Sequence, residues 1–158
     1  MSTSIASRRA AVPAEQEIRF WMRAPAITIN LAASVSEALV LMRDHDVRRL
    51  PVVIDTGELH GIITHGDIRG ADVLRAGGFD LLEIGEVLRR IKVYEVMSQP
   101  AITVTPATGL REAAQLMIEN KIGGLPVVDA DNRVVGIITE SDLFEALMQQ
   151  LDRAVPAR

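Results

Sequence analysis

The chain contains one segment twice, at an offset of 75 residues from Met22 to Met97. The segment 22–68 aligns on 97–143 without a gap. Three motifs recur at this offset: MRAPAIT at 22–28 returns as MSQPAIT at 97–103, LPVV at 50–53 returns at 125–128, and GIIT at 61–64 returns at 136–139. A tandem copy of a small unit predicts two similar units that pack together, with a ligand cleft between them.

Each repeat predicts the order strand, helix, strand, strand, helix. We expect a short buried strand over 26–29, directly after Pro25. A capping box, Ser34-x-x-Glu37, indicates the start of the first helix, because each side chain can accept a hydrogen bond from the other residue's backbone N–H. The apolar stripe of this helix is Val35, Ala38, Leu39 and Met42 in repeat one, and Leu110, Ala113, Ala114 and Met117 in repeat two.

The β-branched segments 50–54 and 59–64 predict a hairpin that turns at 55–57, and its copy turns at 129–132. Thr64 and Thr139 then stand where a strand ends and the closing helix begins. Between the repeats, a helical pattern at Val73 and Leu74 meets a break at Gly77-Gly78. A second amphipathic helix is expected after this break, with the apolar residues Leu81, Leu82, Ile84, Val87, Leu88 and Ile91.

These patterns divide the chain into four parts. We expect a disordered tail at 1–14, repeat one with its extended closing helices at 15–92, repeat two at 93–151, and a frayed tail at 152–158. A short lead-in helix over 15–21 is expected to pack Ile18, Phe20 or Trp21 on the body of the protein. The predicted fold class is α/β, with two tandem βαββα units.

Composition excludes several classes of function. The formal charge of −4 and the aromatic content of 3% argue against nucleic acid as a partner, because that binding needs a basic face and stacking side chains. Cysteine is absent, which fits a reducing cytoplasm. No apolar run is long enough to span a bilayer. The sequence therefore predicts a cytoplasmic chain with no membrane partner.

No catalytic pattern is present in the sequence. It has no Gly-x-Ser-x-Gly elbow, no phosphate loop and no thiol nucleophile, so we expect no catalytic residue, no catalytic cofactor and no enzymatic activity. His60, His65 and Asp67 are close in sequence, but repeat two has no matching histidine, so we predict no metal site. His45, late in the first helix, is interpreted as structural.

The element Gly-Ile-Ile-Thr-x-x-Asp, at 61–67 and 136–142, carries the chemistry of interest. A helix N-terminus attracts phosphate through its unpaired N–H groups, and a carboxylate one turn later can accept both hydroxyls of a ribose. Thr-x-x-Asp is also a helix capping box, worth about 1 kcal/mol without any ligand. The recurrence of the element in both repeats does not decide between ligand binding and helix capping, because a duplicated fold also duplicates its helix caps.

The combination of Pro-x-hydrophobic-Thr, Leu-Pro-Val-Val and Gly-Ile-Ile-Thr-x-x-Asp, twice in tandem, resembles a pair of cystathionine β-synthase (CBS) domains, often called a Bateman module. The resemblance covers about residues 20–149. It implies two βαββα units packed about a pseudo-twofold axis, with one adenosine-nucleotide site per repeat in the clefts between them. Carried over by position, it implies Thr28, Leu50, Pro51, Thr64 and Asp67 for site one, and Thr103, Leu125, Pro126, Thr139 and Asp142 for site two.

The sequence departs from the family pattern just before each Asp. Many members carry a basic residue there, whereas this chain has Gly66 and Ser141. Arg48 and Arg49 are the candidates to bind phosphate instead, or else they are solvated surface charges. Repeat two has glycines at the same positions, so site one is expected to be the more favourable for anions. Glu140, beside Thr139, is expected to point outward.

The resemblance implies a regulatory module without enzymatic activity. The expected ligand is AMP, ADP, ATP or S-adenosylmethionine, which would favour one relative orientation of the repeats for an unidentified regulated protein to recognise. It also suggests a homodimer; Leu39, Leu116 and Met148 are candidates for its interface or for the core. Two alternatives stay open: a dimerisation scaffold with empty clefts, and a regulatory subunit of a nucleotide-metabolism enzyme.

Overall fold

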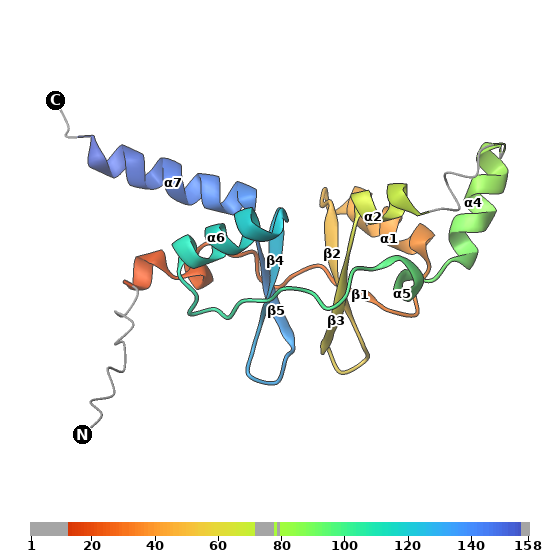
Figure 1. Ribbon diagram of the computed structural model, residues 1–158, viewed down its shortest axis with the longest axis horizontal. Coiled ribbons are helices and arrows are strands. Elements are labelled where there is room, and N and C mark those ends of the chain that lie inside the picture. Colours follow the sequence, from red (N-terminus) through yellow and green to blue (C-terminus); the bar gives the residue numbers. More distant parts are fainter. Residues whose placement is uncertain (1–12, 72–77, 79, 156–158) are drawn as a thin grey trace, which may run out of the picture.

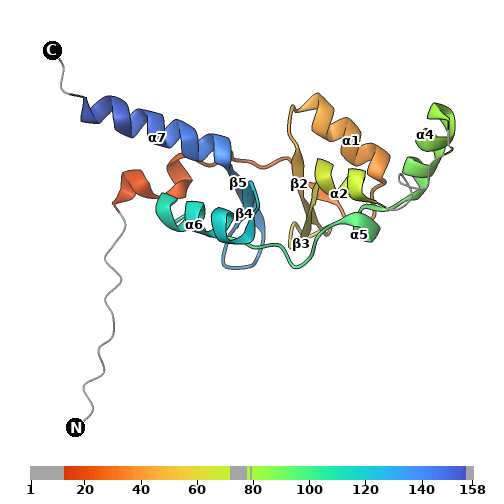
Figure 2. The ribbon, with the colours of Figure 1, turned by 45° about the horizontal axis from the view of Figure 1, so that its top comes forward.

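Two small α/β units lie side by side, and their sheets meet in the middle with helices on the outer sides (Figures 1 and 2). The computed structural model describes residues 13–71, 78 and 80–155. Unit one has a three-stranded sheet of order β1-β2-β3, and unit two has the hairpin β4-β5. The strands are β1 (Ile29–Asn30), β2 (Arg49–Val53), β3 (Leu59–Thr64), β4 (Gly124–Val128) and β5 (Val134–Thr139).

Helices cover the outer face of each sheet. Unit one carries α1 (Val35–Asp44), α2 (His65–Gly70), α4 (Leu81–Arg90) and α5 (Val93–Val96), and unit two carries α6 (Leu110–Asn120) and α7 (Glu140–Ala154). The capping box of Ser34 and Glu37 is confirmed at the start of α1. The stripes of α1 and α6 bury Val35, Ala38 and Met42 in unit one and Ala113 and Met117 in unit two, while Leu39, Leu110 and Ala114 are half-buried.

The two hairpins are related by a pseudo-twofold axis through their tips. Leu59 N donates to Asn132 O at 2.9 Å, and Val134 N donates to Gly57 O at 3.2 Å. These bonds are equivalent at the repeat offset. Gly57 and Asn132 also share a left-handed backbone, with φ of 84° and 59°. The expected packing of the repeats is therefore confirmed.

The lead-in segment of each repeat packs on the opposite unit. The expected lead-in helix is instead two 3-10 helices, η1 (Ala14–Gln16) and η2 (Ile18–Phe20). Ile18 is fully buried in the core of unit two, and its equivalent Val93 is fully buried in the core of unit one. Ile18 N donates to Thr108 O and Val93 N to Ala33 O, both at 2.8 Å. The two lead-in segments, 17–23 and 92–98, are thus exchanged between the units.

The chain after each lead-in segment crosses from one unit to the other (Figure 1). Arg23 pairs with Ile137 of β5, and Ser98 pairs with Ile62 of β3. The equivalent glycines of β3 and β5 permit this close approach: a Cβ on Gly61 would lie 2.7 Å from Ser98 O. Since the cores draw on both repeats, the structural units do not coincide with the segments 15–92 and 93–151.

The exchange also shortens the first strand of each repeat. A strand was expected over 26–29, but β1 is limited to Ile29–Asn30, and its copy is a single bridge between Val104 and Val127. The preceding residues run between the units, where they cannot pair with β2 or β4. The prediction of a full strand was therefore wrong at its N-terminal end.

The segment between the repeats forms the helix that was predicted after Gly77-Gly78, namely α4. The helix that closes repeat two, α7, is longer than predicted. α4 packs on α1, and Leu88 and Ile91 contact the core of unit one. Val73, Leu74 and Gly77 lie outside the described residues, as do 1–12 and 156–158. α7 continues to Ala154, three residues beyond the expected end at Leu151. Within the described ranges, no helix is long and apolar enough to cross a membrane.

Candidate functional site

Both Thr-x-x-Asp elements form helix caps that use one carboxylate oxygen. Thr64 N and Oγ1 each donate to Asp67 Oδ2 at 2.8 Å. Thr139 N and Oγ1 donate to Asp142 Oδ2 at 2.7 and 2.8 Å. The capping interpretation is thus correct for both elements, and each Asp keeps its Oδ1 for another partner.

The remaining oxygen of each Asp contacts the lead-in segment that crosses from the other repeat. Ser98 Oγ donates to Asp67 Oδ1 at 3.1 Å, and Arg23 Nε donates to Asp142 Oδ1 at 3.3 Å. Asp67 is half-buried, whereas Asp142 is only 2% exposed. Positions 23 and 98 are equivalent in the two repeats. The hydrogen-bond donor to Oδ1 therefore differs between Asp67 and Asp142 because the residue at this one position of the lead-in segment differs.

Cleft 1 is a cavity of about 430 Å³ around Thr64 and Asp67, between the units. Its volume lies within the range of small-molecule sites. The end of β3 and the start of α2 form one side, and residues 100–102 and 121–124 of repeat two form the other. The lining residues that carry polar or charged side chains are Arg48, Arg49, Thr64, His65, Asp67, Arg69, Ser98 and Lys121.

Cleft 2 is the pseudo-symmetric cavity of about 580 Å³ around Thr139. The end of β5 and the start of α7 face residues 25–27 and 45–49 of repeat one. The lining residues with polar or charged side chains are Arg23, His45, Asp46, Arg48, Arg49, Thr139, Glu140 and Ser141. Each cleft therefore combines the Thr-x-x-Asp element of one repeat with the first segment of the other.

The structure brings only part of the predicted residue sets together. Arg48 and Arg49 line both clefts, Thr64, Asp67 and Pro126 line cleft 1, and Thr139 lines cleft 2. Six predicted residues line neither cavity: Thr28, Leu50, Pro51, Thr103, Leu125 and Asp142. Leu50, Pro51 and Leu125 are core residues with less than 2% exposure. Because the lead-in segments cross, Thr64 and Asp67 face residues 100–102 rather than Thr28.

Arg49 lies at the boundary between the two clefts, on the backbone of the other unit. Its Nη2 is 2.8 Å from the position that a Cβ on Gly123 would take, and its Cδ is 2.8 Å from that on Gly124. Gly124 is the residue of repeat two that is equivalent to Arg49. An arginine at position 124 would clash with the Arg49 side chain, so only one of the two repeats can carry an arginine there. Burial lowers the pKa of Arg49 below its ordinary value, while the Glu140 carboxylate opposes that shift.

Glu140 points toward cleft 2, and the expectation that it points outward was wrong. Its Oε2 lies 3.0 Å from the Cβ position of Gly123, next to Arg49, and it lines cleft 2. The attraction of the half-buried guanidinium explains this orientation. Glu140 therefore reduces the positive charge of cleft 2.

Sequence reasoning missed several residues that line the clefts. Ser98, Arg69 and Lys121 line cleft 1, and Arg23 and Asp46 line cleft 2. The pairs 23/98 and 46/121 differ in charge between the aligned repeats, and this difference was the signal available in the sequence. Within the described part of the chain, no three His, Cys, Asp or Glu side chains are grouped to hold a metal ion.

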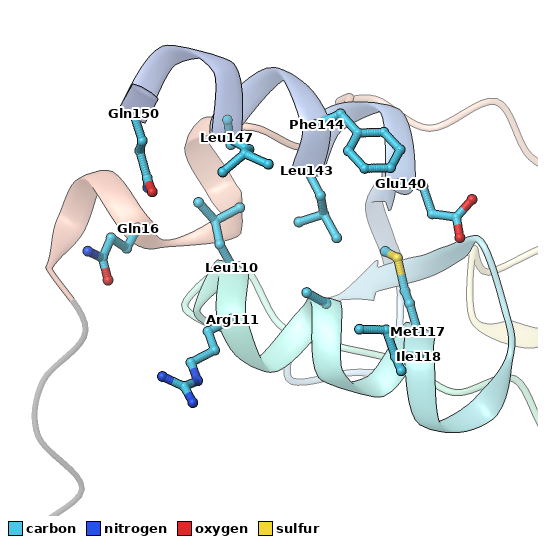
Figure 3. A pocket seen from close by; sticks show the side chains of 12 residues that line it. Gln16, Leu110, Arg111, Met117, Ile118, Glu140, Leu143, Phe144, Leu147 and Gln150 are labelled. Atoms are coloured by element: carbon cyan, nitrogen blue, oxygen red, sulfur yellow. The ribbon is translucent and has the colours of Figure 1, made fainter. Parts of the chain in front are cut away.

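A third hollow, of about 460 Å³, lies between α6 and α7 and shares Glu140 with cleft 2 (Figure 3). In Figure 3, Leu110 and Met117 of α6 and Leu143 and Leu147 of α7 project into the space between the helices. It has few convergent polar groups, so its chemistry suits an apolar contact better than a nucleotide.

The family model for CBS domains matches residues 16–74 and 93–149. The chain belongs to the CBS domain family. A CBS domain-containing protein of Dictyostelium discoideum is 39% identical over 132 residues, which are 82% of this chain and 89% of the relative. Longer relatives include the homoserine O-acetyltransferase of Methanocorpusculum labreanum, 37% identical over 116 residues, which are 73% of this chain and 21% of that enzyme.

Solved CBS pairs share the fold. One, crystallised with 5′-methylthioadenosine and S-adenosyl-L-methionine, has a TM-score of 0.72 and 28% identity, with 85% of this chain and 97% of that chain covered. CBSX2 of Arabidopsis thaliana, solved in complex with AMP, has a TM-score of 0.71 and 28% identity, with 85% and 98% covered. The predicted family and fold class are therefore confirmed.

Proposed function

We propose that this CBS pair is a regulatory module that binds an adenosine-containing nucleotide, such as AMP, ADP, ATP or S-adenosylmethionine, between its two units. The observation that carries the proposal is Asp67, which completes the helix cap through Oδ2 and lines a cavity that arginine and lysine side chains also line. A carboxylate can accept hydrogen bonds from ribose hydroxyls, and the arginine and lysine side chains can pair with phosphate. The solved relatives with bound adenosine compounds support this choice.

The composite clefts suggest how binding could regulate a partner. A ligand in cleft 1 contacts Thr64 and Asp67 from one repeat and residues 100–102 from the other. Binding then favours one relative orientation of the units, and a partner that recognises this orientation receives the signal. We propose no catalytic role for the chain. The regulated protein, and the cytoplasmic location, stay predictions.

A ligand panel with thermal melting tests the proposal. We expect AMP, ADP, ATP or S-adenosylmethionine to raise the melting temperature, and GMP to leave it unchanged. At a hundredfold excess over Kd, binding adds about 2.7 kcal/mol to the free energy of unfolding. Asp67→Ala should weaken binding roughly tenfold to a hundredfold, since it removes a charged hydrogen-bond acceptor, and its lost cap should cost about 1 kcal/mol without ligand.

Each variant is compared with its own ligand-free melting temperature, so that the lost cap does not count as lost binding. Asp131→Ala, in the exposed turn of the β4-β5 hairpin, is the matched control and should keep the full ligand shift. If no adenosine compound shifts the wild type, the clefts stay empty and the alternative of a dimerisation scaffold is supported.

We also propose a homodimer through the exposed apolar stripe of α7. Phe144, Leu147, Met148 and Leu151 are each at least 50% exposed and follow helical spacing. A twofold-related copy would place stripe against stripe. Of the three candidates from sequence, Met148 lies on this stripe, whereas Leu39 and Leu116 pack against the cores.

Light scattering after size exclusion tests the homodimer. We expect the wild type at twice the mass of the chain and Leu147→Glu at the mass of one chain, because a charge would be buried in the apolar contact. Gln149→Glu, an exposed charge change on the same helix, should remain dimeric. A monomeric wild type, or a dimeric Leu147→Glu, would show that α7 is not the interface.

A further inference from the structure

The Oδ1 atoms of Asp67 and Asp142 accept hydrogen bonds from different groups at one equivalent position. The Ser98 hydroxyl donates to Asp67 Oδ1 at 3.1 Å, and the Arg23 guanidinium donates to Asp142 Oδ1 at 3.3 Å. The backbone around the two positions is the same, because residue 23 pairs with β5 as residue 98 pairs with β3. The difference between the clefts therefore comes from the side chain at this position.

The two side chains respond differently to an incoming ribose. A serine hydroxyl rotates, and it can both donate and accept, so it can rearrange around a ribose hydroxyl that donates to Asp67. A guanidinium is always charged and only donates. If it moved away from Asp142, it would leave a carboxylate with 3% side-chain exposure without its cation. Ribose binding is therefore opposed at Asp142 and compatible with Asp67.

The lining of the cavities agrees with this difference. Asp67 lines cleft 1, whereas cleft 2 is lined by Arg23 and not by Asp142. The linings of the two clefts also differ in charge at one position. Lys121 lines cleft 1 and Asp46 lines cleft 2; the two residues are equivalent in the repeats, and both have a left-handed backbone. A phosphate is therefore more favourable in cleft 1 as well.

We propose that Arg23 is a specificity-determining residue that closes cleft 2 to ribose, so that the chain binds one adenosine nucleotide, in cleft 1. This inference rests on the proposed function and adds which cleft is used and why. It also gives the roles of the two Asp residues: Asp67 contacts the ligand, and Asp142 forms a helix cap and an ion pair.

Exchanging the two residues tests the inference, with calorimetric titration of AMP as the readout. The wild type should bind one AMP per chain. Arg23→Ser, which gives cleft 2 the residue of cleft 1, should bind a second AMP. Ser98→Arg should weaken the single site at least tenfold, and the double variant should again bind one AMP. Asp142→Asn, at a site that the ligand does not use, should bind AMP like the wild type.

Two results would overturn the inference while leaving the proposed function intact. One is a wild type that binds two AMP molecules with similar affinity; the other is an Arg23→Ser variant that still binds one. A wild type that binds no AMP would instead contradict the proposed function for this ligand, and the inference with it. Arg23 has a side chain 60% exposed, so Arg23→Ser is expected to fold. Its melting curve is the check on that point.

Discussion

Truncating Ile18 to alanine should lower the free energy of unfolding by about 3 kcal/mol, although Ile18 belongs to repeat one and packs in the other unit. The side chain is fully buried in the core of unit two, and Ile→Ala in a core costs about 2–5 kcal/mol through lost burial and the cavity left behind. Chemical denaturation measures the change. Phe20→Ala is the matched control, because Phe20 is 62% exposed and its truncation should cost little.

Double-mutant cycles then show on which unit Ile18 packs. Met117 belongs to the same core as Ile18, and its equivalent Met42 belongs to the other core. We expect Ile18→Ala to couple with Met117→Ala by more than about 0.5 kcal/mol and to add simply to Met42→Ala. Coupling with Met42 instead of Met117 would mean that the lead-in segments are not exchanged.

Gly61→Ala should destabilise the fold and weaken nucleotide binding together. The new Cβ would lie 2.7 Å from the backbone oxygen of Ser98 and 2.9 Å from Met97 Sδ, so the crossing segment must move. Overpacking of this kind costs about 1–3 kcal/mol. Because Ser98 and residues 100–102 line cleft 1, the same shift should reduce the affinity for AMP. Denaturation and calorimetry measure the two effects.

Gly85→Ala is the matched control for this substitution. Gly85 lies within α4, and a Cβ there would meet nothing within 4 Å. Since alanine is the better helix former, by up to about 1 kcal/mol, this variant should be as stable as the wild type or more so. A Gly61→Ala variant with unchanged stability and affinity would contradict the close crossing of the segment over β3.

The sequence was sufficient to predict the features that depend on local patterns. The hairpins follow from β-branched segments around short turns, and the caps at Ser34, Thr64 and Thr139 follow from side-chain chemistry three residues apart. The twofold packing follows from the repeat itself. All of these can be recognised within a few residues, or from the constant offset between the repeats.

The exchange of lead-in segments could not be predicted from the same information. Ile18 and Val93 are equivalent, so the apolar pattern is the same whether each packs on its own repeat or on the other. The offset is also unchanged by the exchange. The predicted site residues were therefore grouped by repeat, with Thr28 beside Thr64, whereas the crossing places residues 100–102 there. Glu140 was placed wrongly because Arg49 reaches it only across the interface between the units.

The most direct test of the central claim is a crystal structure of the chain with AMP. We expect one nucleotide in cleft 1, with its ribose hydroxyls at Asp67 Oδ1, its base against residues 100–102, and its phosphate near Arg48 and Arg49. Bound AMP in which Asp67 makes no contact, or crystals grown with AMP in which cleft 1 holds no nucleotide, would contradict the claim.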